Sequence, residues 1–240
     1  MAGPRTLKRF CALLSYPGAQ TGEACELLYV ILQSELPAAA RNIAQFGVYL
    51  ERHALWEVEE AYTATFDVNP ACALEIGWHL FGEEYDRGLL LVRLREELRR
   101  HGLSESCELP DHLIHVLPLI GAMSDAEAQR FVTACVQPAV QKMQQAAARS
   151  DSPYRNVLDA LAAVLQSVWG EGRPMPDGSQ VHRADGQTIP EGVDLLHAFP
   201  AADVQFGCGG CPSHDGCEEH PSGPPLVQLT VGNSRSQEGL

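Results

Sequence analysis

The chain has 240 residues, 45% of them hydrophobic, so it is long enough to bury a full apolar core without disulfides or metals. Its formal charge of −14 (17 basic and 31 acidic residues) argues against nucleic-acid binding, because phosphates are neutralised by clustered Lys and Arg. The same acidity disfavours anionic membrane surfaces and favours a basic partner.

The chain carries no apolar run near the roughly 20 residues that cross a bilayer. The apolar stretch 10–14 is also too short for a secretory signal. Five scattered cysteines stand mostly among apolar residues of helical pattern, as free thiols do in a reducing compartment. These are Cys11, Cys25, Cys72, Cys107 and Cys135. We therefore expect a cytoplasmic protein without direct membrane insertion.

Residues 1–170 are predicted to form one amphipathic helix after another, because apolar residues recur there at i, i+3, i+4 and i+7. The apolar faces, in chain order, are Leu7/Phe10/Cys11/Leu14, Cys25/Leu28/Tyr29/Leu32, Ile43/Phe46/Leu50, Leu55/Val58/Tyr62/Phe66, Leu74/Trp78/Phe81, Leu91/Leu94/Leu98, Leu113/Val116/Leu117/Ile120, a segment from 124 through Met143, and Tyr154/Val157/Leu158/Leu161/Val164/Leu165/Val168.

Capping chemistry marks several helix starts. Asn69 and Pro70 are typical of an N-cap and first helical position, so one helix is predicted from there through residue 81. Asp111 is placed to cap the helix that begins beside it. Ser124 and Glu127 form a capping box. Pro138 predicts a kink in the helix that follows.

Residues 171–240 have a different composition, with 11 Gly, 8 Pro and a net charge of −7 (10 acidic residues, 3 Arg). Such a composition resists helix formation. Period-two alternation is confined to Val227, Leu229 and Val231. The predicted fold is therefore all-α: a single globular helical bundle over 1–170, with a Gly/Pro-rich, largely irregular extension over 171–240.

The motifs of common enzymes are missing, since the chain has no phosphate-binding loop, GxGxxG, GxSxG or HExxH. Glu59 and Glu60 are adjacent and face different directions on a helix. His112 and His115 can share one helix face, but two histidines make an incomplete metal site. We expect a binding protein rather than an enzyme.

Two segments are distinctive: YTATFDVNPACALEIGWHLFG (62–82), with Asp-Arg-Gly after it, and ELPDHLIHVLPLI (108–120). Together they resemble the NarJ/TorD/DmsD family of molybdoenzyme assembly chaperones, and most closely its NarJ-type branch. The resemblance covers roughly residues 6–168. The matching residues are Tyr62, Phe66, Asp67, Cys72, Leu74, His79, Phe81, Gly82, Arg87, Gly88, Leu109, Pro110, Asp111 and His112.

The resemblance implies a chaperone that binds the apo catalytic subunit of a respiratory, nitrate reductase-like molybdoenzyme, commonly through its N-terminal segment. It would assist molybdenum cofactor insertion without carrying a cofactor in its helical domain. The sequence leaves a monomer and a weak dimer open. An apolar, basic helix in a groove of an acidic bundle is compatible with this role. The candidate peptide-binding residues are Tyr62, Phe66, Asp67, His79, Arg87, Pro110, Asp111 and His112.

Structural explanations compete for these residues. Asp111 can be a cap alone or a cap that also contacts the ligand, and Asp67 can simply end a helix. The aromatic side chains can be core, His79 can be a hydrogen-bonded buried residue, and Arg87 can form a local ion pair. Two other functions also stay open: a metal-binding helical interaction module, and a metal-dependent enzyme that uses the C-terminal cysteines and histidines.

The extension contains a Cys/His cluster in which a possible ligand recurs every third residue among glycines: Cys208, Cys211, His214, Cys217 and His220. Thiolate and imidazole together suit zinc, which takes four ligands in structural sites. An iron–sulfur cluster is less favoured, because three cysteines are one short of the usual four. A flexible acidic terminus with exposed thiols is the alternative.

We predict that anaerobically purified protein contains bound zinc, because the cluster offers five ligands for four positions. Metal analysis should show that a Cys211→Ser, Cys217→Ser variant loses this zinc. A native protein with less than about a tenth of an equivalent of zinc or iron would leave no metal site there.

Overall fold

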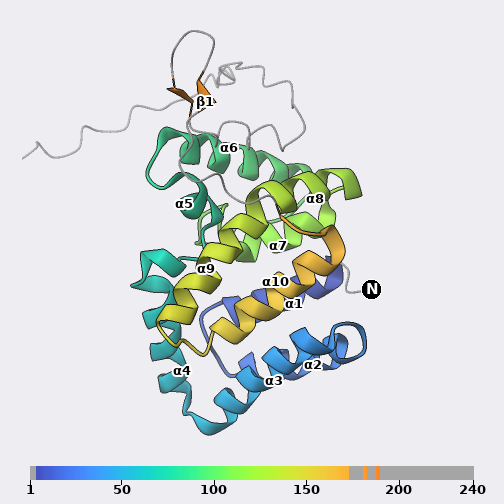
Figure 1. The fold of residues 1–240 in the computed structure, drawn as a ribbon, viewed down its shortest axis with the longest axis vertical. Coiled ribbons are helices and arrows are strands. Elements are labelled where there is room, and N and C mark those ends of the chain that lie inside the picture. The colour runs from blue at the N-terminus through green and yellow to red at the C-terminus, as the bar shows by residue number, and fades with distance from the viewer. Residues whose placement is uncertain (1–3, 173–180, 183–187, 190–240) are drawn as a thin grey trace, which may run out of the picture. The chain divides into compact units, whose positions relative to one another are not determined.

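The computed structural model describes residues 4–172, 181–182 and 188–189, all within the first of the chain's two units, Met1–Ala202. Helices follow one another throughout 4–172, which confirms the predicted all-α class (Figure 1). They are α1 (Pro4–Leu14), α2 (Thr21–Glu35), α3 (Pro37–Arg52), α4 (Leu55–Tyr62), π-turn η1 (Thr63–Asp67), 3-10 turn η2 (Pro70–Cys72), α5 (Ile76–Phe81), α6 (Tyr85–Arg100), α7 (Leu113–Ala122), α8 (Asp125–Phe131), π-turn η3 (Val132–Val136), α9 (Gln137–Arg149) and α10 (Arg155–Trp169).

The core is built around α10, which packs against α3, α9 and α1 (Figure 1). Its predicted stripe is almost wholly buried, and each buried Leu or Val contributes about 1.5–3 kcal/mol. Tyr154, just before α10, meets three aromatic rings at centroid distances of 4.9–5.6 Å: Phe46, Tyr62 and Phe66. On α6 the buried face uses Leu90 in place of the predicted Leu91.

Helices α1 and α7 pack closely, although α7 contains Pro118 in its interior. Proline has no N–H, so the carbonyl of Ile114 one turn earlier loses its helical donor. The Cys11 thiol of α1 lies 3.7 Å from that carbonyl oxygen and donates to it. The Cys11 thiol therefore replaces the main-chain donor that α7 lacks at Pro118.

The helix predicted from Pro70 to Phe81 is wrong, because the chain forms the turn η2 and then the short helix α5. Asn69 still caps, but it caps η2, by accepting from the N–H of Ala71. The helix is interrupted because its main chain pairs elsewhere: the carbonyl of Leu74 accepts from Leu113. Tertiary hydrogen bonds thus override the local helical pattern.

The segment from Ser124 onward is helical, and the predicted capping box of Ser124 and Glu127 is present. Before Pro138 the helix widens into the π-turn η3. Such bulges accommodate a local break in the hydrogen-bond ladder. The irregularity expected at Pro138 therefore lies one turn earlier, at 132–136.

After Gly172 the structure describes only β1 (Val181–His182) and β2 (Thr188–Ile189), an antiparallel pair with Val181 opposite Ile189. Their position agrees with strand content after residue 170. The alternating residues Val227, Leu229 and Val231 and the possible metal ligands Cys208, Cys211, His214, Cys217 and His220 lie outside the described residues. Among the helices that are described, none is long and apolar enough to cross a membrane.

Candidate partner-binding groove

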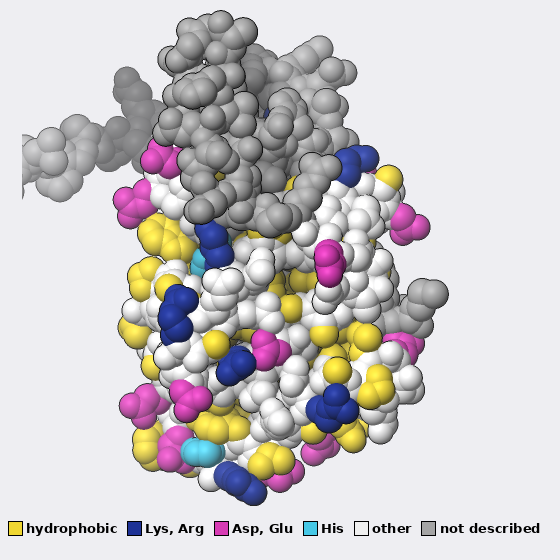
Figure 2. Space-filling view, in the orientation of Figure 1, with side chains coloured by type: hydrophobic (Ala, Val, Ile, Leu, Met, Phe, Trp, Pro, Cys, Tyr) yellow, Lys and Arg dark blue, Asp and Glu magenta, His cyan; other side chains and the backbone are white. Residues whose placement is uncertain are grey.

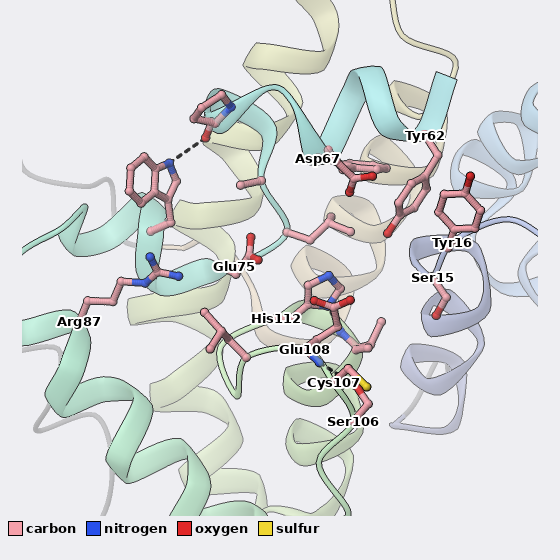
Figure 3. Close-up of a pocket in the computed structure, with 17 residues that line it drawn as sticks. Ser15, Tyr16, Tyr62, Asp67, Glu75, Arg87, Ser106, Cys107, Glu108 and His112 are labelled. Carbon is pink, nitrogen blue, oxygen red and sulfur yellow. Dashed lines mark hydrogen bonds between the residues drawn. The ribbon is translucent and has the colours of Figure 1, made fainter. Parts of the chain in front are cut away.

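A groove of about 770 Å³ opens where the end of α1, the α4–η1 junction, the segment before α5 and the loop before α7 meet (Figure 3). Both distinctive sequence segments contribute to its walls. The lining residues are Ser15, Tyr16, Tyr62, Phe66, Asp67, Pro70, Ala73, Leu74, Glu75, Trp78, Arg87, Ser106, Cys107, Glu108, Leu109, His112 and Ile114.

The two segments are held together by main-chain hydrogen bonds at the base of the groove. Ile76 N–H donates to the Asp111 carbonyl at 2.9 Å, and Leu113 N–H donates to the Leu74 carbonyl at 3.0 Å. Glu75 and His112 form an isolated antiparallel bridge between these bonds. This crossing, defined as residues 74–76 with 111–113, places Glu75 and His112 on the same surface.

Aromatic side chains form one wall of the groove. Tyr62 is anchored by donating its hydroxyl to the Leu14 carbonyl at 3.0 Å, and it meets Tyr16 and Phe66 edge to face. Tyr62 and Phe66 are buried against Tyr154, whereas Tyr16 is 58% exposed. The predicted core role and the predicted binding role of Tyr62 and Phe66 are therefore compatible, because each ring also borders the groove.

The short π-helix η1 places Asp67 at the edge of the groove. Val68 N–H donates to the Thr63 carbonyl five residues earlier, which widens the helix at its end. The Thr65 hydroxyl fastens this turn to Ser152, 2.6 Å away in the loop before α10. Phe66 consequently packs inward while Asp67 is exposed beside the groove (Figure 3).

The groove has an acidic character. Asp67, Glu75 and Glu108 line it, against a single Lys or Arg, Arg87. Burial raises the pKa of Tyr62. The charges of Asp67, Glu75 and Glu108 raise this pKa further, so all three carboxylates act on the Tyr62 hydroxyl. Burial also raises the pKa of Glu75. By contrast, the face of the bundle seen in Figure 2 carries both basic and acidic side chains.

Arg87 lies against Trp78, with the guanidinium carbon 5.7 Å from the ring centroid, and donates from Nε to Asp111 Oδ2 at 3.2 Å. The Asp111 carboxylate is fully buried, and this burial raises its pKa, against the lowering effect of Arg87. Only glycine fits at position 77, because a Cβ there would lie 2.6 Å from Asp111 Oδ2. The local ion pair expected for Arg87 is thus present.

Asp111 does not cap the helix that follows it, so the predicted cap is wrong. His112 is the N-cap of α7, and its Nδ1 accepts from Ile114 N–H at 3.1 Å. Asp111 instead accepts a hydrogen bond from the start of α5, from Ile76 N–H to its main-chain carbonyl. It stabilises a helix that is distant in sequence, which local capping rules do not anticipate.

The histidines are buried and hydrogen-bonded. Burial lowers the pKa of His112 to about 4, with a further contribution from His115. His115 Nε2 lies 3.1 Å from both the amide nitrogen and the hydroxyl of Ser106. His79 Nε2 bonds to the Ala73 carbonyl at 2.7 Å, as expected for a structural histidine. Within the described residues, no group of three or more His, Cys, Asp or Glu is placed to hold a metal.

Five of the eight predicted binding residues line the groove: Tyr62, Phe66, Asp67, Arg87 and His112. The other three, His79, Pro110 and Asp111, are buried away from it.

Sequence reasoning missed Trp78, Glu75 and Glu108 as lining residues, although all three stand inside the distinctive segments. It also missed Ser15 and Tyr16, because no local signal links the end of α1 to the two distinctive segments, which lie far along the chain.

Comparison with known proteins gives a consistent result. A family model described as "Nitrate reductase delta subunit" matches residues 32–160. The nitrate reductase molybdenum cofactor assembly chaperone NarJ of Escherichia coli (strain K12) is 26% identical over 205 residues, covering 82% of this chain and 84% of the relative. A probable chaperone of the same description from Bacillus subtilis (strain 168) is 29% identical over 176 residues, covering 68% and 89%.

We predict that Gly77→Ala destabilises the protein by about 1–3 kcal/mol, since the new methyl group overpacks a site next to the buried carboxylate. Gly88→Ala is the matched control, because a Cβ on that helical glycine meets nothing within 4 Å. This control should gain up to about 1 kcal/mol from helix propensity. Thermal unfolding of both variants checks the difference, and equal melting temperatures would contradict it.

We also predict a pH dependence of stability from His112. Its pKa is about 4 in the folded protein against 6.5 ordinarily, so the unfolded chain binds more protons between these values. The stabilisation is complete above pH 6.5 and is lost as the pH falls toward 4, by up to about 3 kcal/mol.

His112→Asn isolates this effect, because Asn retains the cap but does not titrate. The raised pKa values of Glu75 and Asp111 act in both proteins and cancel in the comparison. Urea unfolding at a series of pH values should show wild type losing stability relative to the variant on acidification. Parallel curves would rule His112 out as the cause.

Proposed function

The chain belongs to the nitrate reductase delta subunit family, whose model matches more than half of it, and from this membership we propose that it is an assembly chaperone for a nitrate reductase-like molybdoenzyme. The relatives named above are themselves designated molybdenum cofactor assembly chaperones, not enzymes. In this role the protein binds the apo catalytic subunit and keeps it competent for cofactor insertion.

The observation that carries the proposal is the groove, which combines an aromatic wall with three carboxylates. Tyr16, Trp78 and Leu109 offer apolar surface to a ligand, while Asp67, Glu75 and Glu108 offer negative charge beside it. A helix with an apolar face and flanking basic residues is complementary to both features. We assign this ligand to the N-terminal segment of the catalytic subunit.

Hydrolytic chemistry is the alternative raised by Ser106 and His115, whose Oγ and Nε2 lie 3.1 Å apart. However, His115 Nε2 also accepts the main-chain N–H of Ser106, and Ser106 Oγ accepts from Glu108 N–H. These bonds form a closed turn before α7. Among the hydrogen bonds of residues 4–172, none links a carboxylate to His115 as an orienting group would require. The turn therefore favours a structural role.

Co-purification from the native host, followed by mass spectrometry, is the direct test. The expected partner is the catalytic subunit of a molybdoenzyme, recovered in larger amount when cofactor synthesis is blocked. Recovery of the catalytic subunit in its mature form only, or of no molybdoenzyme subunit, would contradict the assignment.

We predict that a synthetic peptide of that subunit's N-terminal segment binds the full-length protein in calorimetric titration. Asp67→Asn with Glu108→Gln should weaken binding roughly tenfold at low salt. The loss should shrink as salt is added, because exposed charges are screened. Asp125→Asn, an exposed acid on α8, is the control and should leave affinity unchanged. Equal affinity of wild type, the double variant and Asp125→Asn would exclude an electrostatic role for Asp67 and Glu108.

A further inference from the structure

We propose that Asp111 is a positioning residue for the groove, which sets the guanidinium of Arg87 on the groove wall, and that Arg87 rather than Asp111 contacts the bound segment. This inference rests on the proposed function of the groove. Asp111 is 0% exposed and does not line the groove, whereas the Arg87 side chain is 20% exposed and does.

The position of Asp111 is fixed from several sides. Its main-chain carbonyl accepts from Ile76, and its carboxylate lies directly against Gly77. The missing side chain at Gly77 allows that approach. The paired main chain of Asp111 and the packing of its buried carboxylate against Gly77 leave that carboxylate little freedom, so Arg87 has a defined partner before any ligand arrives.

The bond to Asp111 uses only part of the guanidinium. Nε donates to Asp111 Oδ2, while the planar group carries five N–H donors in total. Among the described residues, no hydrogen bond is formed by the terminal nitrogens of Arg87. The guanidinium carbon also lies 5.7 Å from the Trp78 ring centroid, and both side chains line the groove. The terminal N–H groups can therefore donate to an acceptor oxygen of a bound segment.

Asp111 also prevents Arg87 from neutralising the groove. Glu75 is a competitor on the groove wall, because the charge of Arg87 acts on it, yet among the described residues the two form no ion pair within 4.0 Å. Without Asp111 the guanidinium would be free to turn to Glu75. The Arg87–Asp111 pair thus keeps the positive charge of Arg87 apart from the negative charge of Glu75. The bound segment therefore needs a hydrogen-bond acceptor near Arg87 and a positive charge near Glu75.

A double-mutant cycle on the full-length protein tests this, with the synthetic N-terminal peptide of the catalytic subunit as the probe. The variants are Asp111→Asn, Arg87→Gln and both together, each checked by thermal unfolding. We expect each single change to weaken peptide binding roughly tenfold, and the double change to weaken it no further than Arg87→Gln alone. If the affinity loss of the double variant equals the product of the two single losses, Asp111 contacts the peptide itself.

Arg87→Gln alone is decisive if Asp111→Asn does not fold. Removing a cation from an acidic groove should tighten or preserve binding of a basic peptide unless Arg87 makes a contact of its own. Weaker binding supports the proposal, and equal or tighter binding overturns it. If wild type does not bind the peptide at all, it is the proposed function that fails, which separates the two outcomes.

Discussion

The crossing of residues 74–76 with 111–113 is the interaction on which the groove depends. It joins two segments that are more than thirty residues apart with two main-chain hydrogen bonds and one bridge pair. Main-chain polar groups inside a protein must be paired, so these residues leave the helical pattern in order to pair with each other. The break before α5 and the start of α7 both follow from this pairing.

The crossing also explains how a buried ion pair is tolerated beside an open groove. A charge inside a protein is costly unless it is paired and hydrogen-bonded. Asp111 meets both conditions at Oδ2, where Arg87 supplies the charge and a hydrogen bond, whereas Oδ1 is buried without a hydrogen-bond partner among the described residues. The cost of burying the carboxylate is offset by the ion pair that also orients Arg87 at the groove wall.

Membership of the nitrate reductase delta subunit family agrees with this organisation, since the matched residues 32–160 contain the crossing and nearly all of the groove. Ser15 and Tyr16 lie outside the matched range and complete the aromatic end of the groove. The packing of α1 on α7, including the Cys11 thiol against the Ile114 carbonyl, brings them there. The groove therefore belongs to the folded bundle as a whole and not to one contiguous motif.

The sequence by itself determined the helical class and most helices, because helical periodicity and capping are local properties. The two segments that contribute most of the groove stood out through their resemblance to a chaperone family. Five of the residues proposed from the sequence line the groove: Tyr62, Phe66, Asp67, Arg87 and His112. Only the tertiary structure decided that Asp111 stabilises α5 instead of capping α7, and that Ser15 and Tyr16 reach the groove. The physical reason is that a carboxylate or an amide is satisfied by whichever partner the packing brings near. That partner depends on how distant helices pack, which local periodicity and capping do not encode.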